Sequence, residues 1–112
     1  IAKEYADDED AFSKKIYDVI GAGVGIIESV PAAVSIAYYT QDPNKCCLMC
    51  ANLGGDTDTI GAMATAICGA FVGYSKINPE YTELLRVQNP ETDFEEYINI
   101  LEKGRELLGC GR

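Results

Sequence analysis

Residues 58–73, DTIGAMATAICGAFVG, constrain the fold more than any other stretch of the chain. Behind Asp58 the segment carries no charge, and most of its side chains are Gly, Ala, Thr or Cys. Such small side chains let neighbouring helices approach closely, so we predict a central helix here. The nearly charge-free run 59–75 is shorter than the ~18 residues that a membrane-spanning helix needs, so we expect no membrane segment.

Three further helices are predicted before this one. Residues 10–20 have apolar side chains at helical spacing and stop at Gly21. Ser29 and Pro31 indicate the start of a second helix, which should run to Tyr39 and be buried. A third helix is expected over about 44–53, with Asp42 as its cap and Pro43 just inside, and it should end at the glycine pair 54–55.

Two more helices are predicted beyond residue 74. One should span residues 79 to about 87, and the last should open at Thr92, with Glu95 three positions later as a capping box. The last helix carries an apolar stripe of Phe94, Ile98, Leu101 and Leu108. No useful length of sequence alternates with period two, so the predicted fold class is all-α, as one domain over 1–112.

Composition narrows the possible functions. The 112 residues carry 18 acids against 9 bases, a net charge of −9, which would repel a nucleic-acid backbone. The chain has five cysteines, three of which are crowded at 46, 47 and 50. This pattern does not resemble a secreted disulfide framework, so we expect a reducing, cytoplasmic origin. The first residue is Ile and not Met, so we expect a processed product or a piece of a longer protein.

The turn 54–59, GGDTDT, is the first candidate for chemistry. Asp56 and Asp58, two positions apart outside a helix, can point their carboxylates toward one point, and the hydroxyl of Thr59 adds a third hard oxygen. Such oxygen ligands suit Mg²⁺, Mn²⁺ or Ca²⁺, whereas Zn²⁺ prefers His or Cys, and the chain has no His. Because Mg²⁺ takes ~6 oxygens, water, substrate or another segment must complete the shell.

Each candidate has a structural alternative. Asp56 or Asp58 can simply cap the following helix, for ~1 kcal/mol, which explains one aspartate but not two beside a glycine pair. Cys47 and Cys50 form a C-x-x-C motif without a second pair, so we favour small apolar groups buried on a helix over a zinc or redox site. The spacing of the glycines at 21, 23 and 25 is a weak phosphate-loop signal, and Glu28 is more typical of a favourable charge at a helix start than of a catalytic acid.

Two motifs, GAGVGIIESVPAAV (residues 21–34) and CANLGGDTDTIGAMATAICGAFVG (residues 50–73), occur in this order. Together they closely resemble the C-terminal part of the ADP-ribosylglycohydrolase family. The likeness covers about residues 10–108 and includes INPEYTELL (residues 77–85), which is similar to a family segment with one Asn inserted.

This resemblance implies the C-terminal portion of an orthogonal helical bundle and an enzyme that removes ADP-ribose from modified proteins or from related small molecules. It implies two Mg²⁺ or Mn²⁺ ions as cofactors, with Asp56, Asp58 and Thr59 as ligands and Asp58 bridging both ions. The loop 21–25 matches the segment that lies along the ADP-ribose, which makes Gly21, Gly23 and Val24 the implied substrate-binding residues. Ala22 stands where some relatives have Asn.

The family's remaining metal ligands and its catalytic acidic residue are expected upstream of this chain, because residues 1–50 contain nothing similar to its Thr-Asp-Asp run. The leading hypothesis is therefore a C-terminal fragment that is inactive by itself. Rival hypotheses are a non-catalytic structural or partner-binding relative and a simple Ca²⁺ module. A helical fragment without its partner helices would expose an apolar patch, so we also expect self-association to be possible.

Overall fold

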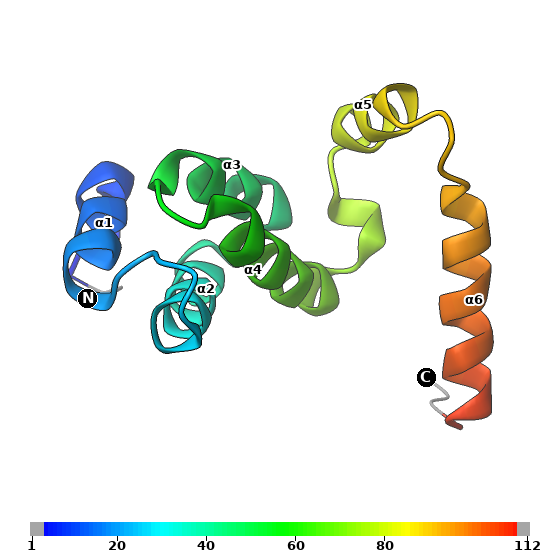
Figure 1. The fold of residues 1–112 in the computed structure, drawn as a ribbon, viewed down its shortest axis with the longest axis horizontal. Helices are drawn as coiled ribbons and strands as arrows, with labels where there is room; N and C mark the ends of the chain where they lie inside the picture. Colours follow the sequence, from blue (N-terminus) through cyan, green and yellow to red (C-terminus); the bar gives the residue numbers. More distant parts are fainter. Residues whose placement is uncertain (1–3, 110–112) are drawn as a thin grey trace. The chain divides into compact units, whose positions relative to one another are not determined.

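The computed structural model describes residues 4–109, and every regular element in that range is helical (Figure 1). The predicted all-α fold class is confirmed. The chain divides into two compact units between Asn78 and Pro79. Over the described residues, no helix has both the length and the apolar character that a bilayer crossing requires.

The first unit begins with helix α1 (Glu9–Lys15), which continues directly into the π-helical turn η1 (Ile16–Ile20). The Asp8 side chain caps α1 by accepting a 2.9 Å hydrogen bond from the backbone N–H of Ala11. At the other end the N–H of Gly21 donates to the carbonyl of Ile16 across 3.0 Å, five residues back. The predicted helix over 10–20 is present, and its last turn is wider than an α-helical turn.

Helix α2 (Ile26–Thr40) starts several residues earlier than predicted. The carbonyl of Gly25 accepts from the backbone N–H groups of both Glu28 and Ser29 at 2.9 Å, so the helix is already formed there. Ser29 is buried on the core face and is not the cap. Pro31 lies inside the helix, beyond its first turn. The prediction of a start at Ser29 and Pro31 was therefore wrong, whereas the end after Tyr39 is confirmed.

Helices α3 (Pro43–Leu53) and α4 (Thr57–Val72) pack against each other and against α2 (Figure 1). Asp42 caps α3 as predicted, because its carboxylate accepts from the N–H of Asn44 at 2.9 Å. The two helices approach closely at Gly61 of α4, where an added Cβ would lie 3.4 Å from the Cβ of Cys50 on α3. The expectation that small residues in this helix allow close packing is met at that position.

The cysteines of α3 do not all share one environment. Cys46 and Cys50 lie in the core with Met49 and Leu53, at the i, i+3, i+4, i+7 spacing of one helix face. Cys47, one position further round, is exposed. The prediction that all three helical cysteines are buried was wrong for Cys47.

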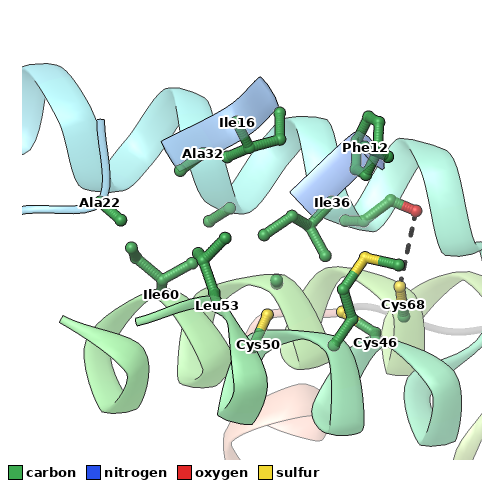
Figure 2. Close-up of a cluster of buried hydrophobic side chains, with 14 residues drawn as sticks. Phe12, Ile16, Ala22, Ala32, Ile36, Cys46, Cys50, Leu53, Ile60 and Cys68 are labelled. Carbon is green, nitrogen blue, oxygen red and sulfur yellow. Dashed lines mark hydrogen bonds between the residues drawn. The ribbon is translucent and has the colours of Figure 1, made fainter. Parts of the chain in front are cut away.

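The core of the first unit lies between α2 on one side and α3 with α4 on the other, and Phe12 and Ile16 add their side chains to it (Figure 2). Phe12 of α1 stacks on Tyr39 of α2 with ring centroids 3.9 Å apart. The Tyr39 hydroxyl donates to the carbonyl of Tyr5 at 2.7 Å, which ties the segment before α1 to α2. The buried apolar residues are Phe12, Ile16, Ala22, Ala32, Ala33, Ile36, Ala37, Cys46, Met49, Cys50, Leu53, Ile60, Ala64 and Cys68.

The first unit ends with a short 3-10 helix, η2 (Tyr74–Lys76). Asn44 at the start of α3 holds this segment through its side chain, which donates to the carbonyl of Lys76 at 2.8 Å and accepts from the N–H of Asn78 at 2.6 Å. These two bonds fix the segment that follows α4 against the start of α3.

The second unit contains α5 (Pro79–Gln88) and α6 (Phe94–Leu107), and neither helix has a buried residue. Arg86 of α5 and Glu95 of α6 form an ion pair of 2.8 Å. The cap of α6 is Asp93, whose carboxylate accepts from the N–H of Glu96 at 3.0 Å. The predicted Thr92 cap was wrong by one residue, because Asp93 and Glu96 repeat the same spacing with a carboxylate as the cap.

Candidate functional site

The turn between α3 and α4 presents the predicted metal ligands. Gly54 and Gly55 have φ of +85° and +73°, a conformation that side chains disfavour. Asp56 is the residue immediately before α4 and is half-buried. Asp58 and Thr59 lie in the first turn of the helix and are exposed. The turn therefore places all three oxygen-bearing side chains at the positive end of α4, where the free N–H groups favour negative charge.

The two aspartates are close enough to interact. The pKa of Asp58 lies below its ordinary value, because its carboxylate shares a hydrogen bond with the carboxyl of Asp56 and is also bonded to the backbone N–H groups of Thr59 and of Asp58 itself. Asp56 occupies the cap position of α4 but makes no capping hydrogen bond with its side chain. The capping alternative thus fits Asp58 in part and leaves the Asp56 carboxylate without that role.

The loop 21–25 is the second predicted part of the site. Gly21 has a φ of +94°, and the side chain of Val24 is 84% exposed. The N–H of Gly23 donates to the carboxylate oxygen Oε2 of Glu28 at 2.7 Å. The loop therefore bends over the first turn of α2 and offers an apolar side chain to the outside.

This loop touches the turn 54–59, which we call the metal turn after its predicted ligands, although the two are more than thirty residues apart in sequence. The N–H of Asp56 donates to the carbonyl of Ala22 at 2.7 Å. A Cβ added to Gly55 would lie only 2.2 Å from that carbonyl oxygen, so the contact requires glycine at this position. The structure brings the candidate residues Gly21, Gly23 and Val24 beside the turn that carries the three predicted metal ligands.

The sequence predicted no role for Glu28 or Ala22 in holding the loop 21–25 against the turn 54–59. Glu28 was interpreted as a favourable charge at a helix start, yet its carboxylate holds the loop. Ala22 is buried in the core, and its carbonyl accepts the bond from the turn (Figure 2). No local pattern predicts the contact of Ala22 with Asp56, because only the tertiary fold joins that loop to that turn. The bond of Glu28 to Gly23 spans only five residues at the start of α2.

The donor chemistry of the turn fits Mg²⁺ or Mn²⁺ in kind. Two carboxylates and a hydroxyl are hard oxygen donors, as these cations prefer. Within residues 4–109, no group of three or more acidic or cysteine side chains is arranged to hold a metal ion. Three oxygen-bearing side chains are fewer than a Mg²⁺ shell of ~6 oxygens needs, and the incomplete set of ligands stays a prediction.

A separate cavity of about 700 Å³ lies between α1 with η1 and α3. Its wall combines acidic and basic side chains with Tyr17 and Asn52, and it reaches Gly54, whose added Cβ would lie 3.4 Å from the Tyr17 ring. Asp56, Asp58 and Thr59 do not line it. The cavity borders the glycine pair but is not the metal turn.

Three of the cysteines, Cys46, Cys50 and Cys68, are buried in the core, and none of the described cysteines forms a disulfide. Cys46, Cys47, Cys50 and Cys68 are all free, and Cys110 lies outside the described residues. The pKa of the Cys46 thiol is raised far above its ordinary value, first by a hydrogen bond with Cys50 and then by burial. Burial likewise raises the pKa of Cys68. Neutral, enclosed thiols of this kind behave as small apolar groups, in line with the structural alternative for this motif.

The loop 21–25 and the turn 54–59 both lie in the part of the chain that matches a known protein family. The model of the ADP-ribosylglycohydrolase family matches residues 1–108 of this chain. The chain belongs to the ADP-ribosylglycohydrolase family. The resemblance inferred from the two motifs is therefore confirmed, and so is the helical fold that it implies.

Individual members of the family are similar over most of the chain. The uncharacterized protein YegU of Escherichia coli K12 is 50% identical over 102 residues, which cover 90% of this chain and 30% of that protein. The ADP-ribosylarginine hydrolase Tri1 of Serratia proteamaculans is 30% identical over 96 residues, with 74% and 26% covered. The mouse ADP-ribosylhydrolase ARH3 is 32% identical over 82 residues, with 62% and 22% covered.

The chain thus spans less than a third of the length of each of these relatives. No solved structure matches the chain significantly.

Proposed function

We propose that this chain is the C-terminal, metal-holding part of a Mg²⁺- or Mn²⁺-dependent hydrolase that releases ADP-ribose from modified proteins or from related ADP-ribosyl compounds. Membership of the family and the names of two relatives, an ADP-ribosylhydrolase and an ADP-ribosylarginine hydrolase, support the reaction class. The observation that carries the proposal is the hydrogen bond from Asp56 to Ala22, because it puts an oxygen-rich turn beside a glycine-rich loop.

In this proposal Asp56, Asp58 and Thr59 hold the cations. When bound, such ions orient a substrate and stabilise developing negative charge. The two carboxylates would offset part of the positive charge of the cations at the N-terminal end of α4, whose free N–H groups would repel a bare cation. This need for extra negative charge accounts for two aspartates where a helix cap needs only one.

The loop 21–25 would lie along the ADP-ribose, with contacts from Gly21, Gly23 and Val24. Val24 offers an exposed apolar side chain suited to a flat aromatic or sugar face. The isolated 112 residues would be inactive, because three oxygen donors are too few for one Mg²⁺ ion, let alone two. The remaining ligands and the catalytic acid would come from other parts of the parent protein.

The proposal is tested on the native polypeptide that contains this chain, purified from its source cells at its natural length. We expect release of ADP-ribose from ADP-ribosylated proteins or compounds in the presence of Mg²⁺ or Mn²⁺ and not after chelation. The Asp58→Asn variant should lose this activity. Glu96→Gln, which removes an acid from the first turn of α6, is the matched control and should keep it.

A native polypeptide that releases no ADP-ribose from any of these compounds with either cation would overturn the proposal. The result would favour the rival hypothesis of a non-catalytic structural or partner-binding relative, since a fold does not determine a function.

A further inference from the structure

The peptide group between Ala22 and Gly23 is held at both of its ends. Its carbonyl oxygen accepts from the N–H of Asp56 at 2.7 Å, and its N–H donates to Oε2 of Glu28 at 2.7 Å. One rigid, planar unit therefore connects the first turn of α2 to the start of α4. Any rotation of this peptide would break both bonds together.

Glu28 is enclosed by the loop that it holds. A Cβ added to Gly21 would lie 2.6 Å from Cδ of Glu28, and one added to Gly23 would lie 2.5 Å from Oε2. The glycines at 21 and 23 therefore make room for this carboxylate. This finding gives both residues a role that does not depend on a bound ligand.

The acceptor is also charged. A carboxylate that accepts from an N–H makes a shorter and stronger bond than a neutral oxygen does, and hydrogen bonds in a chain polarise one another. The negative charge at the N–H end of the peptide should increase the electron density on the Ala22 carbonyl. The bond from Asp56 should strengthen as a result.

We propose that Glu28 is a positioning residue that keeps the loop 21–25 in register with the metal turn. It acts through the Ala22–Gly23 peptide and contacts neither metal nor substrate. The inference deepens the proposed function of the same site and rests on it for its consequence in binding. That consequence is weaker binding of the ADP-ribosyl compound on the loop when the carboxylate is removed, while the metal ligands stay in place.

The same geometry restricts how the loop recognises ADP-ribose. The Gly23 N–H is already bonded to an anion, so it is not open to a diphosphate oxygen. Gly23 then contributes by its lack of a side chain and by the path of its backbone. A ligand approaching this side of the loop should bind through its sugar or base more than through its phosphates.

Amide hydrogen exchange of the 112-residue chain tests the coupling directly. Replacing Glu28 with Ala should speed exchange at Gly23 and at Asp56 together, by about 10- to 100-fold, which corresponds to the loss of a charge-assisted hydrogen bond. Glu28→Gln keeps a neutral acceptor of the same size and should give a smaller increase at both amides. The Glu96→Gln control should change neither.

Faster exchange at Gly23 with unchanged exchange at Asp56 would overturn the proposal, because the peptide would then not transmit the effect. If Glu28→Ala fails to fold, the Glu28→Gln comparison decides alone, since its shape is conserved. Equal exchange in Glu28→Gln and the unmodified chain at both amides would also contradict a role for the charge.

The consequence for binding is measured on the native-length polypeptide. Glu28→Gln should raise KM for the ADP-ribosyl substrate by about tenfold or more and change kcat much less. A fall in kcat at unchanged KM would contradict positioning of the loop. If the unmodified polypeptide releases no ADP-ribose, the proposed function fails, whereas the exchange experiment still decides whether Glu28 couples the loop to the turn.

Discussion

A methyl group on Gly55 would lie 2.2 Å from the carbonyl oxygen of Ala22, so glycine at position 55 is what allows the metal turn to meet the loop. The φ of +73° at Gly55 adds a second reason for glycine, because side chains rarely adopt this conformation.

Replacing Gly55 with Ala should therefore destabilise the fold. We expect a loss of about 2 kcal/mol or more in the free energy of unfolding, from backbone strain together with the clash. Gly69→Ala is the matched control, because a Cβ there meets nothing within 4 Å inside helix α4. It should stabilise the protein by about 0.5–1 kcal/mol. Urea unfolding measures both changes, and a Gly55→Ala variant as stable as the original would contradict the contact.

Tyr39→Phe tests how the segment before α1 is held. The variant keeps the stack on Phe12 but loses the 2.7 Å bond to the Tyr5 carbonyl. Its free energy of unfolding should therefore be about 1 kcal/mol lower. Tyr38→Phe, in the exposed neighbour, should change stability by no more than about 0.5 kcal/mol. Equal effects of the two variants in urea unfolding would show that the bond of the Tyr39 hydroxyl to Tyr5 contributes nothing to stability.

The same tyrosine predicts a pH dependence at the alkaline end. Burial raises the pKa of the Tyr39 phenol above its ordinary value of 10.0, with the Lys45 charge opposing this shift. The unfolded chain therefore loses this proton first, so stability is full below pH 10 and falls as the pH rises beyond it. Tyr39→Phe should show a weaker alkaline loss of stability than the original chain, and identical pH profiles would contradict the shift.

Thiol labelling tests the environments of the cysteines. In a Cys110→Ser background, which removes the thiol outside the described residues, a polar alkylating reagent should modify Cys47 in the native state. Cys46, Cys50 and Cys68 should react only on unfolding, because they are buried. Mass spectrometry of digested protein locates the label. Rapid native labelling at Cys50 or Cys68 would contradict the packing of α3 against α4.

The sequence predicted those helix ends that are set by a capping side chain or by a glycine next to the helix. Asp42 with Pro43 starts α3, and Gly73 ends α4, because caps and positive-φ glycines act through their immediate neighbours. Ser29 with Pro31 resembles such a signal. It misled the prediction because the burial of Ser29 on the core face depends on packing between helices.

The exposure of Cys47 could have been predicted from sequence. The spacing of 46, 49, 50 and 53 already defines a buried face of α3, and position 47 falls outside it. The metal ligands stay a prediction, made because two acids beside a glycine pair exceed what a cap needs. The contact of Ala22 with Asp56 could not be predicted, since it joins a loop and a turn that are more than thirty residues apart in sequence. The bond of Gly23 to Glu28 is local, and the sequence analysis missed it by assigning Glu28 only a charge effect at the helix start.

In the proposed site, Asp56, Asp58 and Thr59 of the turn 54–59 bind a divalent cation. Paramagnetic broadening of amide NMR signals, when Mn²⁺ is added to the 112-residue chain, tests this and detects weak as well as tight binding. We expect broadening that is centred on the turn and extends to the loop 21–25, and that Asp58→Asn abolishes and Glu96→Gln keeps. Broadening that spreads evenly over the acidic residues, or that survives Asp58→Asn unchanged, would contradict it.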